Sequence, residues 1–257
     1  MNVVTLGVPL EAEFWRIVFL MARSGGALVA APIFMATGVP ALVRVSVAAA
    51  IAIFVALWVP VGPVPQVQSF VGMIDIVGEL AIGLSLGFVL QIIFAAPILA
   101  SEIIGGGMGL SMAVGMGPDG AQHPVIGRFM TVVMVILFFG TGGHLVWFRL
   151  LIESYAVFPP GAPWMEADRF RDIAFFGGTV FLAGLVIALP ITFLLLLVQL
   201  MAGVLSRSAP QLNIFALGLP LGVLAGLGGL ILTAPIIFAG LEELIELGLT
   251  QAAGLVT

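Results

Sequence analysis

The sequence predicts an all-α integral membrane protein, built from several apolar helices and ending in a long, bent helical hairpin. Hydrophobic residues make up 61% of the 257 residues and charged residues only 8%, whereas about a quarter of the residues in soluble domains are charged. Only helices or closed barrels satisfy their backbone hydrogen bonds in lipid, and the apolar runs lack the alternation that barrel strands show. No polar block is long enough to bury a second core, so we expect residues 1–257 to form a single domain.

Composition also excludes several classes of function. All eight basic residues are arginine and the formal net charge is −5, which argues against a nucleic-acid partner, because that needs clustered positive charge. A chain without lysine cannot carry a Walker-type phosphate loop. The two histidines lie in separate segments and there is no cysteine, so the sequence predicts no catalytic site, metal or cofactor. We therefore expect a protein that is not an enzyme.

In the first half of the chain, charges are expected to mark the helix ends, because a membrane span needs about 20 mostly apolar residues. Glu11, Glu13 and Arg16 precede the first long run, unlike the positive start of a secretory signal, so we expect residues 1–21 to stay on the mature chain. The "PVGPVPQ" stretch forbids a continuous helix at Pro60–Gln66. The charge-free windows are residues 24–43, 45–74, 80–101, 103–118 and 129–148.

The last two apolar windows, Ile173–Ser206 and Ser208–Leu241, are longer than a simple span requires. Each has about 34 residues and would measure about 50 Å as a straight helix, more than the hydrocarbon thickness of a bilayer. Only Arg207 separates them, and Pro190 and Pro220 interrupt them. We interpret the pair as a long hairpin with a polar tip; four short spans with re-entrant turns are the alternative.

Glycines at four-residue spacing predict faces where helices pack closely. Such faces are formed by Gly83 and Gly87, and by Gly218, Gly222 and Gly226, because small residues let helix backbones approach each other.

The segment "SEIIGGGMGLSMAVGMGPDG" also has residues at four-residue spacing, here both glycine and methionine. Met108, Met112 and Met116 recur every four residues and would form one stripe on a helix, beside Gly105 and Gly109. Methionine is flexible and glycine weakens a helix, so the segment suits a deformable seal in a pore. A packed helix in which methionine fills gaps is the alternative, and composition alone favours it.

Acidic residues near the apolar runs have two interpretations. Asp75 and Glu79 share a helix face and are candidates for ion or proton handling, but a helix start at the membrane interface is favoured. Glu102, directly before the glycine-rich stretch, fits an interfacial position or a pairing with a neighbouring subunit equally well. A cluster of glutamates after the last apolar run, Glu242, Glu243 and Glu246, is expected to end a helix in water.

Three stretches resemble the FliR family of type III secretion export-gate subunits, which includes the injectisome proteins SctT, YscT and SpaR. They are "RSGGALVAAPIFMATGVPALVRV", "GLSLGFVLQIIFAAPILASEIIGGGMGLSMA" and "SRSAPQLNIFALGLP". The resemblance covers about Arg23 to Leu241, and the Ser-Arg-x-x-Pro-Gln-x-Asn element is its most specific part. One departure is the order "GPDG" at Gly117–Gly120, which leaves a role for Asp119 open.

This resemblance implies a subunit of an export gate that passes unfolded substrates across the bacterial inner membrane, within the flagellar basal body. The implied partners are FliP-like, FliQ-like and FlhB-like subunits, the substrates in transit and membrane lipid. The chain would fuse a FliP-like part, about residues 1–172, to a FliQ-like hairpin, about residues 173–241. A secondary transporter of a small solute and a purely structural scaffold are the alternatives.

The resemblance also assigns residues to roles. The family's plug maps onto about Gly106–Pro124, and the hypothesis is that Gly105–Gly117 closes the resting channel. The plug residues are Gly105, Gly106, Gly107, Met108, Gly109, Met112, Met116 and Gly117. Four residues of the hairpin tip, Arg207, Pro210, Gln211 and Asn213, would serve assembly. Glu102 and Asp119 are candidates for a polar position in the pore or an interface.

Overall fold

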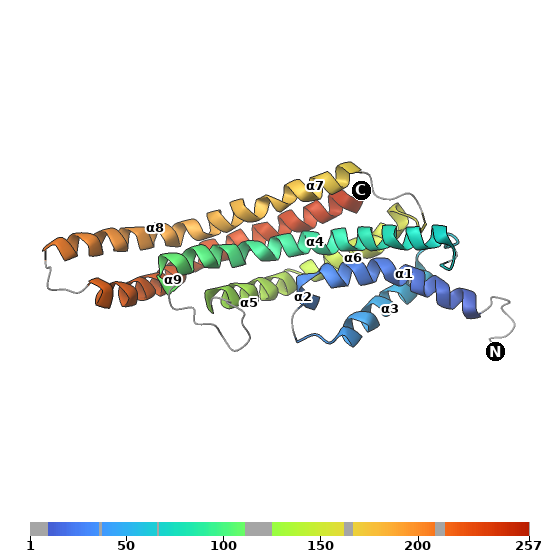
Figure 1. Cartoon of the computed structure of the whole chain (residues 1–257), viewed down its shortest axis with the longest axis horizontal. Helices are drawn as coiled ribbons and strands as arrows, with labels where there is room; N and C mark the ends of the chain where they lie inside the picture. The colour runs from blue at the N-terminus through green and yellow to red at the C-terminus, as the bar shows by residue number, and fades with distance from the viewer. Residues whose placement is uncertain are drawn as a thin grey trace. The chain divides into compact units, whose positions relative to one another are not determined.

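The computed structural model describes residues 10–35, 38–65, 67–110, 125–161, 167–208 and 214–256, and every regular element in these ranges is a helix. Figure 1 shows these helices, whose bounds are α1 Leu10–Ala30, α2 Pro32–Met35, α3 Ala41–Trp58, α4 Phe70–Gly107, α5 Val125–Gly140, α6 Gly143–Val157, α7 Ala167–Gly177, α8 Thr179–Ser208 and α9 Ile214–Val256. Within these ranges, four stretches are long and apolar enough to cross a membrane: α3, α4, α9, and α7 with α8. A fifth results if α5 and α6 form one broken span. The predicted all-helical membrane fold is confirmed.

The chain divides into two compact units that do not follow chain order. Unit 1 comprises Met1–Gln91, Gly142–Gly177 and Gly248–Thr257, and unit 2 comprises Ile92–Thr141 and Gly178–Leu247. The boundaries therefore fall inside α4 and inside α9. A single domain with a FliP-like part at residues 1–172 and a FliQ-like part at 173–241 stays a prediction.

In unit 1, α1 packs directly against the first half of α4. A Cβ atom at Gly83 would lie 2.0 Å from the carbonyl oxygen of Arg23, and one at Gly87 would lie 2.4 Å from that of Ala27. Any larger residue at these positions would push the helices apart. The close approach predicted from Gly83 and Gly87 is confirmed.

Unit 2 contains α8 and most of α9, the two helices of the long hairpin. Helix α8 has 30 residues and α9 has 43, about 45 and 65 Å at the usual rise per residue. Pro190 lies inside α8, and Pro220 and Pro235 lie inside α9. Since both helices continue through their prolines, the long hairpin is confirmed and the alternative of four short spans is wrong.

Charges prove to be poor markers of helix ends in this chain. Arg23 lies inside α1 and is fully buried, and the apolar window that follows it, residues 24–43, is divided among α1, α2 and α3. The expected helix end at Glu242, Glu243 and Glu246 is also wrong, because α9 continues to Val256. These glutamates are exposed, but Leu241, Leu244 and Ile245 between them are buried. The end of α9 is thus amphipathic, and its polar face reaches water without ending the helix.

Candidate functional site

The glycine-rich turn that ends α4 is the described part of the predicted plug. Gly105, Gly106 and Gly107 are the last three residues of α4. The N–H of Met108 donates to the carbonyl of Ile104 at 2.9 Å, and the N–H of Gly109 donates to that of Gly106 at 3.1 Å. Gly109 has a φ of 77°, a left-handed conformation that glycine adopts without strain and that commonly ends a helix.

Met108 is seated on α9, over two glycines of the predicted stripe. Its side chain is 2% exposed. A Cβ atom at Gly226 would lie 2.4, 2.5 and 2.6 Å from the Cγ, Sδ and Cε atoms of Met108, and one at Gly222 would lie 3.0 Å from its carbonyl oxygen. The absence of side chains at Gly222 and Gly226 therefore creates the space that Met108 fills.

Helix α8 also contacts the last turn of α4. The Nε2 atom of Gln199 donates to the carbonyl oxygen of Gly107 at 2.8 Å, which satisfies one of the carbonyls left free at the end of α4. A Cβ atom at Gly107 would lie 3.0 Å from the Cδ1 atom of Leu195. The end of α4 is therefore held by both helices of the hairpin.

The remaining predicted site residues are only partly covered by the structure. Glu102 is exposed on α4, and Arg207 is exposed in the last turn of α8. The plug residues Met112, Met116 and Gly117, together with Asp119, lie outside the described residues, as do the tip residues Pro210, Gln211 and Asn213. The roles assigned to the plug and the tip stay predictions.

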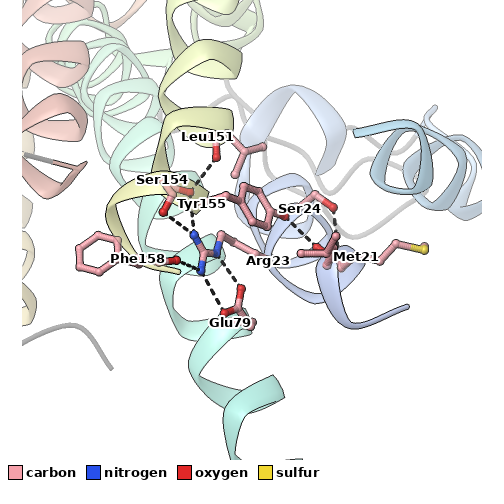
Figure 2. Close-up of polar contacts among 9 residues, drawn as sticks. Met21, Arg23, Ser24, Glu79, Leu151, Ser154, Tyr155 and Phe158 are labelled. Carbon is pink, nitrogen blue, oxygen red and sulfur yellow. Dashed lines mark hydrogen bonds and ion pairs between the residues drawn. The ribbon is translucent and has the colours of Figure 1, made fainter. Parts of the chain in front are cut away.

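A buried ion pair in unit 1, between Arg23 of α1 and Glu79 of α4, was not predicted. Figure 2 shows the guanidinium facing the carboxylate, with Nε to Oε2 at 2.8 Å and Nη2 to Oε1 at 3.0 Å. Arg23 is 0% exposed and Glu79 is 3% exposed. This two-point geometry is the strongest arrangement for arginine and a carboxylate.

The other donors of Arg23 bind the C-terminal end of α6. Nη1 donates to the carbonyl oxygen of Ser154 at 2.6 Å and to its Oγ atom at 3.2 Å, and Nη2 donates to the carbonyl oxygen of Phe158 at 2.8 Å. All five N–H groups of the guanidinium are thereby used. A cation at this end of α6 also complements the helix dipole.

Neighbouring side chains extend this cluster to α3. The ring of Tyr155 lies beside the guanidinium of Arg23 (Figure 2), 4.3 Å from its carbon atom. The hydroxyl of Tyr155 donates to the carbonyl of Leu20 at 2.7 Å. The hydroxyl of Ser24 donates to the carbonyl of Ala48 in α3 at 3.0 Å. Four helices of unit 1, α1, α3, α4 and α6, are thus tied together around Arg23.

Sequence reasoning placed Glu79 at a helix start on the membrane interface, and this interpretation is wrong. Glu79 lies within α4, buried against Arg23. One signal could have identified the pair: Glu79 precedes Gly83 and Gly87 at the same four-residue spacing and so shares the α4 face that was predicted to pack closely. A carboxylate on such a face requires a cation from the facing helix.

Comparison with known proteins gives consistent matches along most of the chain. The family model described as "Bacterial export proteins, family 1" matches residues 14–248. The flagellar biosynthetic protein FliR of Escherichia coli is 36% identical over 238 residues, which cover 91% of this chain and 88% of the relative. FliR of Pectobacterium carotovorum is 34% identical, covering 87% and 84%, and FliR of Bacillus subtilis is 28% identical, covering 91% and 92%.

Proposed function

Because the chain belongs to the FliR family of bacterial export proteins, we propose that it is a subunit of the type III flagellar export gate in the bacterial inner membrane. The family comprises export proteins, in agreement with the prediction that the chain is not an enzyme. In this proposal the chain forms part of the wall of a channel for unfolded proteins, and residues Gly105–Gly117 form its plug.

The seated end of α4 is the observation that carries the plug proposal. The structure describes this segment as far as Leu110, and Met108 and Gly107 are held there by α8 and α9. A plug needs a defined attachment in the closed state, because a segment that closes a pore must return to the same place after each opening. The glycines and methionines beyond that point supply an apolar, adaptable surface.

Ion conductance tests the plug. Gly105–Gly117 is replaced by a flexible polar segment of equal length in the assembled complex, which is then reconstituted into lipid vesicles. We expect leakage of small ions to rise, because a polar segment neither excludes water nor packs against apolar walls. Unchanged leakage, with the complex still assembled, would refute the plug. A replacement of Gly62 and Pro63, which are exposed in the connection between α3 and α4, serves as the control for a loop altered elsewhere.

The structure gives less support to a secondary transporter. That class places ionisable groups in broken helices near the middle of the membrane. Pro190 and Pro220 lie inside continuous helices. Glu79, the one acidic side chain that is buried among the described residues, is bound by Arg23 at two points and is therefore not free to bind an ion.

The proposed partners are FliP-like, FliQ-like and FlhB-like subunits. Exposed apolar side chains run along α8, among them Phe181, Phe193, Leu200 and Val204, each more than half exposed, and such a face is covered by lipid or by other helices. Native mass spectrometry of the tagged chain, purified in mild detergent with its neighbouring gene products, tests this. One copy among several FliP-like and FliQ-like subunits is expected, and a lone monomer or homodimer would refute the proposed assembly.

A further inference from the structure

We propose that Met108 and Gln199 form a releasable lock on the last turn of α4, and that this turn unwinds when protein passes through the channel. The lock comprises the side chain of Met108 over Gly222 and Gly226, and the hydrogen bond from Gln199 to Gly107. The inference rests on the proposed function, since it assigns positioning residues to the proposed gate.

The first observation is that the last turn of α4 is weak on its own. Residues Gly105, Gly106 and Gly107 follow one another, and glycine is the least favourable helix residue after proline. Packing does not require glycine at the first two positions, because a Cβ atom at Gly105 or Gly106 would meet no described atom within 4 Å. The turn therefore depends on support from outside α4.

The second observation is that this support comes from contacts that can be broken without leaving a buried charge. Met108 is held by apolar contact with a notch in the surface of α9, the space left by the absent side chains of Gly222 and Gly226. Its unbranched side chain can change rotamer more readily than a branched one. Gln199 makes a hydrogen bond between two neutral groups, so breaking it leaves no charge without a partner. The Arg23 cluster is different, because breaking it would leave charges buried.

Unwinding would lengthen the connection that follows α4. Three residues that change from helical to extended conformation gain roughly 5 Å, since the rise per residue increases from about 1.5 to about 3.3 Å. The part of α4 before Gly105 would stay in place, because Ile104 and Ala100 are 0% exposed. Release of the lock therefore moves the attachment point of the following chain while the helix remains packed.

A reversible cross-link tests whether the lock must open. The double variant Met108→Cys and Gly226→Cys is built in a chain that has no cysteine of its own, and a Cβ atom at Gly226 would lie beside the Cγ position of residue 108. The assembled complex in inverted membrane vesicles is assayed for protein export and ion leakage. We expect oxidation to abolish export without raising leakage above that of the reduced form of the same variant, and reduction to restore export. Wild-type export in the oxidised form would overturn the proposal, and failure of the cysteines to cross-link would contradict the seat itself.

A second variant avoids any cross-link. The double substitution Gly105→Ala and Gly106→Ala stabilises the last turn in space that is open, and it should lower the population of the unwound turn about 20-fold. We expect export to slow accordingly with no rise in leakage. Export at the wild-type rate would count against unwinding.

A matched pair of substitutions on α9 tests the notch. Gly226→Ala places a methyl group within 2.6 Å of the Met108 side chain, whereas Gly228→Ala places one where no described atom lies within 4 Å. We expect Gly226→Ala to raise ion leakage and Gly228→Ala to leave it unchanged. Equal leakage from the two variants would contradict a role for the seat of Met108.

These results separate the lock from the proposed function. If replacement of Gly105–Gly117 raises leakage but the oxidised cross-link exports normally, the plug stands and the lock is refuted. If that replacement leaves leakage unchanged, the plug itself fails.

Discussion

Substitution of Arg23 by methionine should strongly destabilise unit 1. The change removes the guanidinium and leaves the carboxylate of Glu79, which is 3% exposed, without its cation. It also removes donors from the carbonyl groups of Ser154 and Phe158 at the end of α6. Methionine retains much of the length and apolar surface of the arginine stem, so the loss is mainly electrostatic.

The expected magnitude follows from burial and geometry. Removing one partner of a buried ion pair costs about 3–5 kcal/mol, so we expect Arg23→Met to lower the free energy of unfolding by about 4 kcal/mol. Glu79→Gln should cost a similar amount, about 3–5 kcal/mol, because it leaves the guanidinium buried without its carboxylate, although the amide oxygen still accepts one hydrogen bond. The double variant Arg23→Met, Glu79→Met should be more stable than Arg23→Met alone, since no buried charge remains.

Equilibrium unfolding in detergent micelles, followed by tryptophan fluorescence, measures these differences. Trp147 is 2% exposed in the same unit and reports on its packing. The control is Arg149→Met, because Arg149 and Glu153 also form an ion pair, at 2.7 Å, but their side chains are 77% and 45% exposed. Exposed pairs of this kind contribute little. If Arg23→Met and Arg149→Met shifted the transition equally, burial would not be the source of the stabilisation.

Three further outcomes are expected. Gly26→Ala should destabilise unit 1 in the same unfolding assay, because the new Cβ atom would lie 2.8 Å from a carbonyl oxygen of α4, whereas Gly25→Ala, in open space, should not. Tyr155→Phe should cost about 1 kcal/mol, since it removes one buried hydrogen bond and keeps the ring over the guanidinium. Arg207→Ala should lower the yield of purified complex more than Arg16→Ala, and equal yields would remove Arg207 from the proposed assembly tip.

Apolar length and glycine spacing predicted the fold well. The two long windows at Ile173–Ser206 and Ser208–Leu241 became the helices of the hairpin, although α9 extends to Val256. Gly83 and Gly87 correctly indicated a close helix contact. A glycine lets another helix approach closely whichever part of the chain that helix comes from. Such features depend on local sequence alone.

The charged residues were harder to interpret, because their meaning depends on partners distant in the chain. Arg23 looked like a helix end until its contact with Glu79, 56 residues away, and with Phe158, 135 residues away, was known. Gln199 gave no signal in the sequence, since its importance comes from its distance to one carbonyl oxygen, that of Gly107. Sequence can place such groups on a helix face but cannot choose their partners.

The distances along the chain between Arg23 and its partners have a consequence for biosynthesis. A ribosome that adds about 5–20 residues per second produces Glu79 roughly 3–11 s after Arg23, because 56 residues separate them. The carbonyl of Phe158 follows only after 135 residues. The nascent guanidinium must therefore stay in contact with water or lipid headgroups during this interval, and α1 can take its buried position only after α4 has been made.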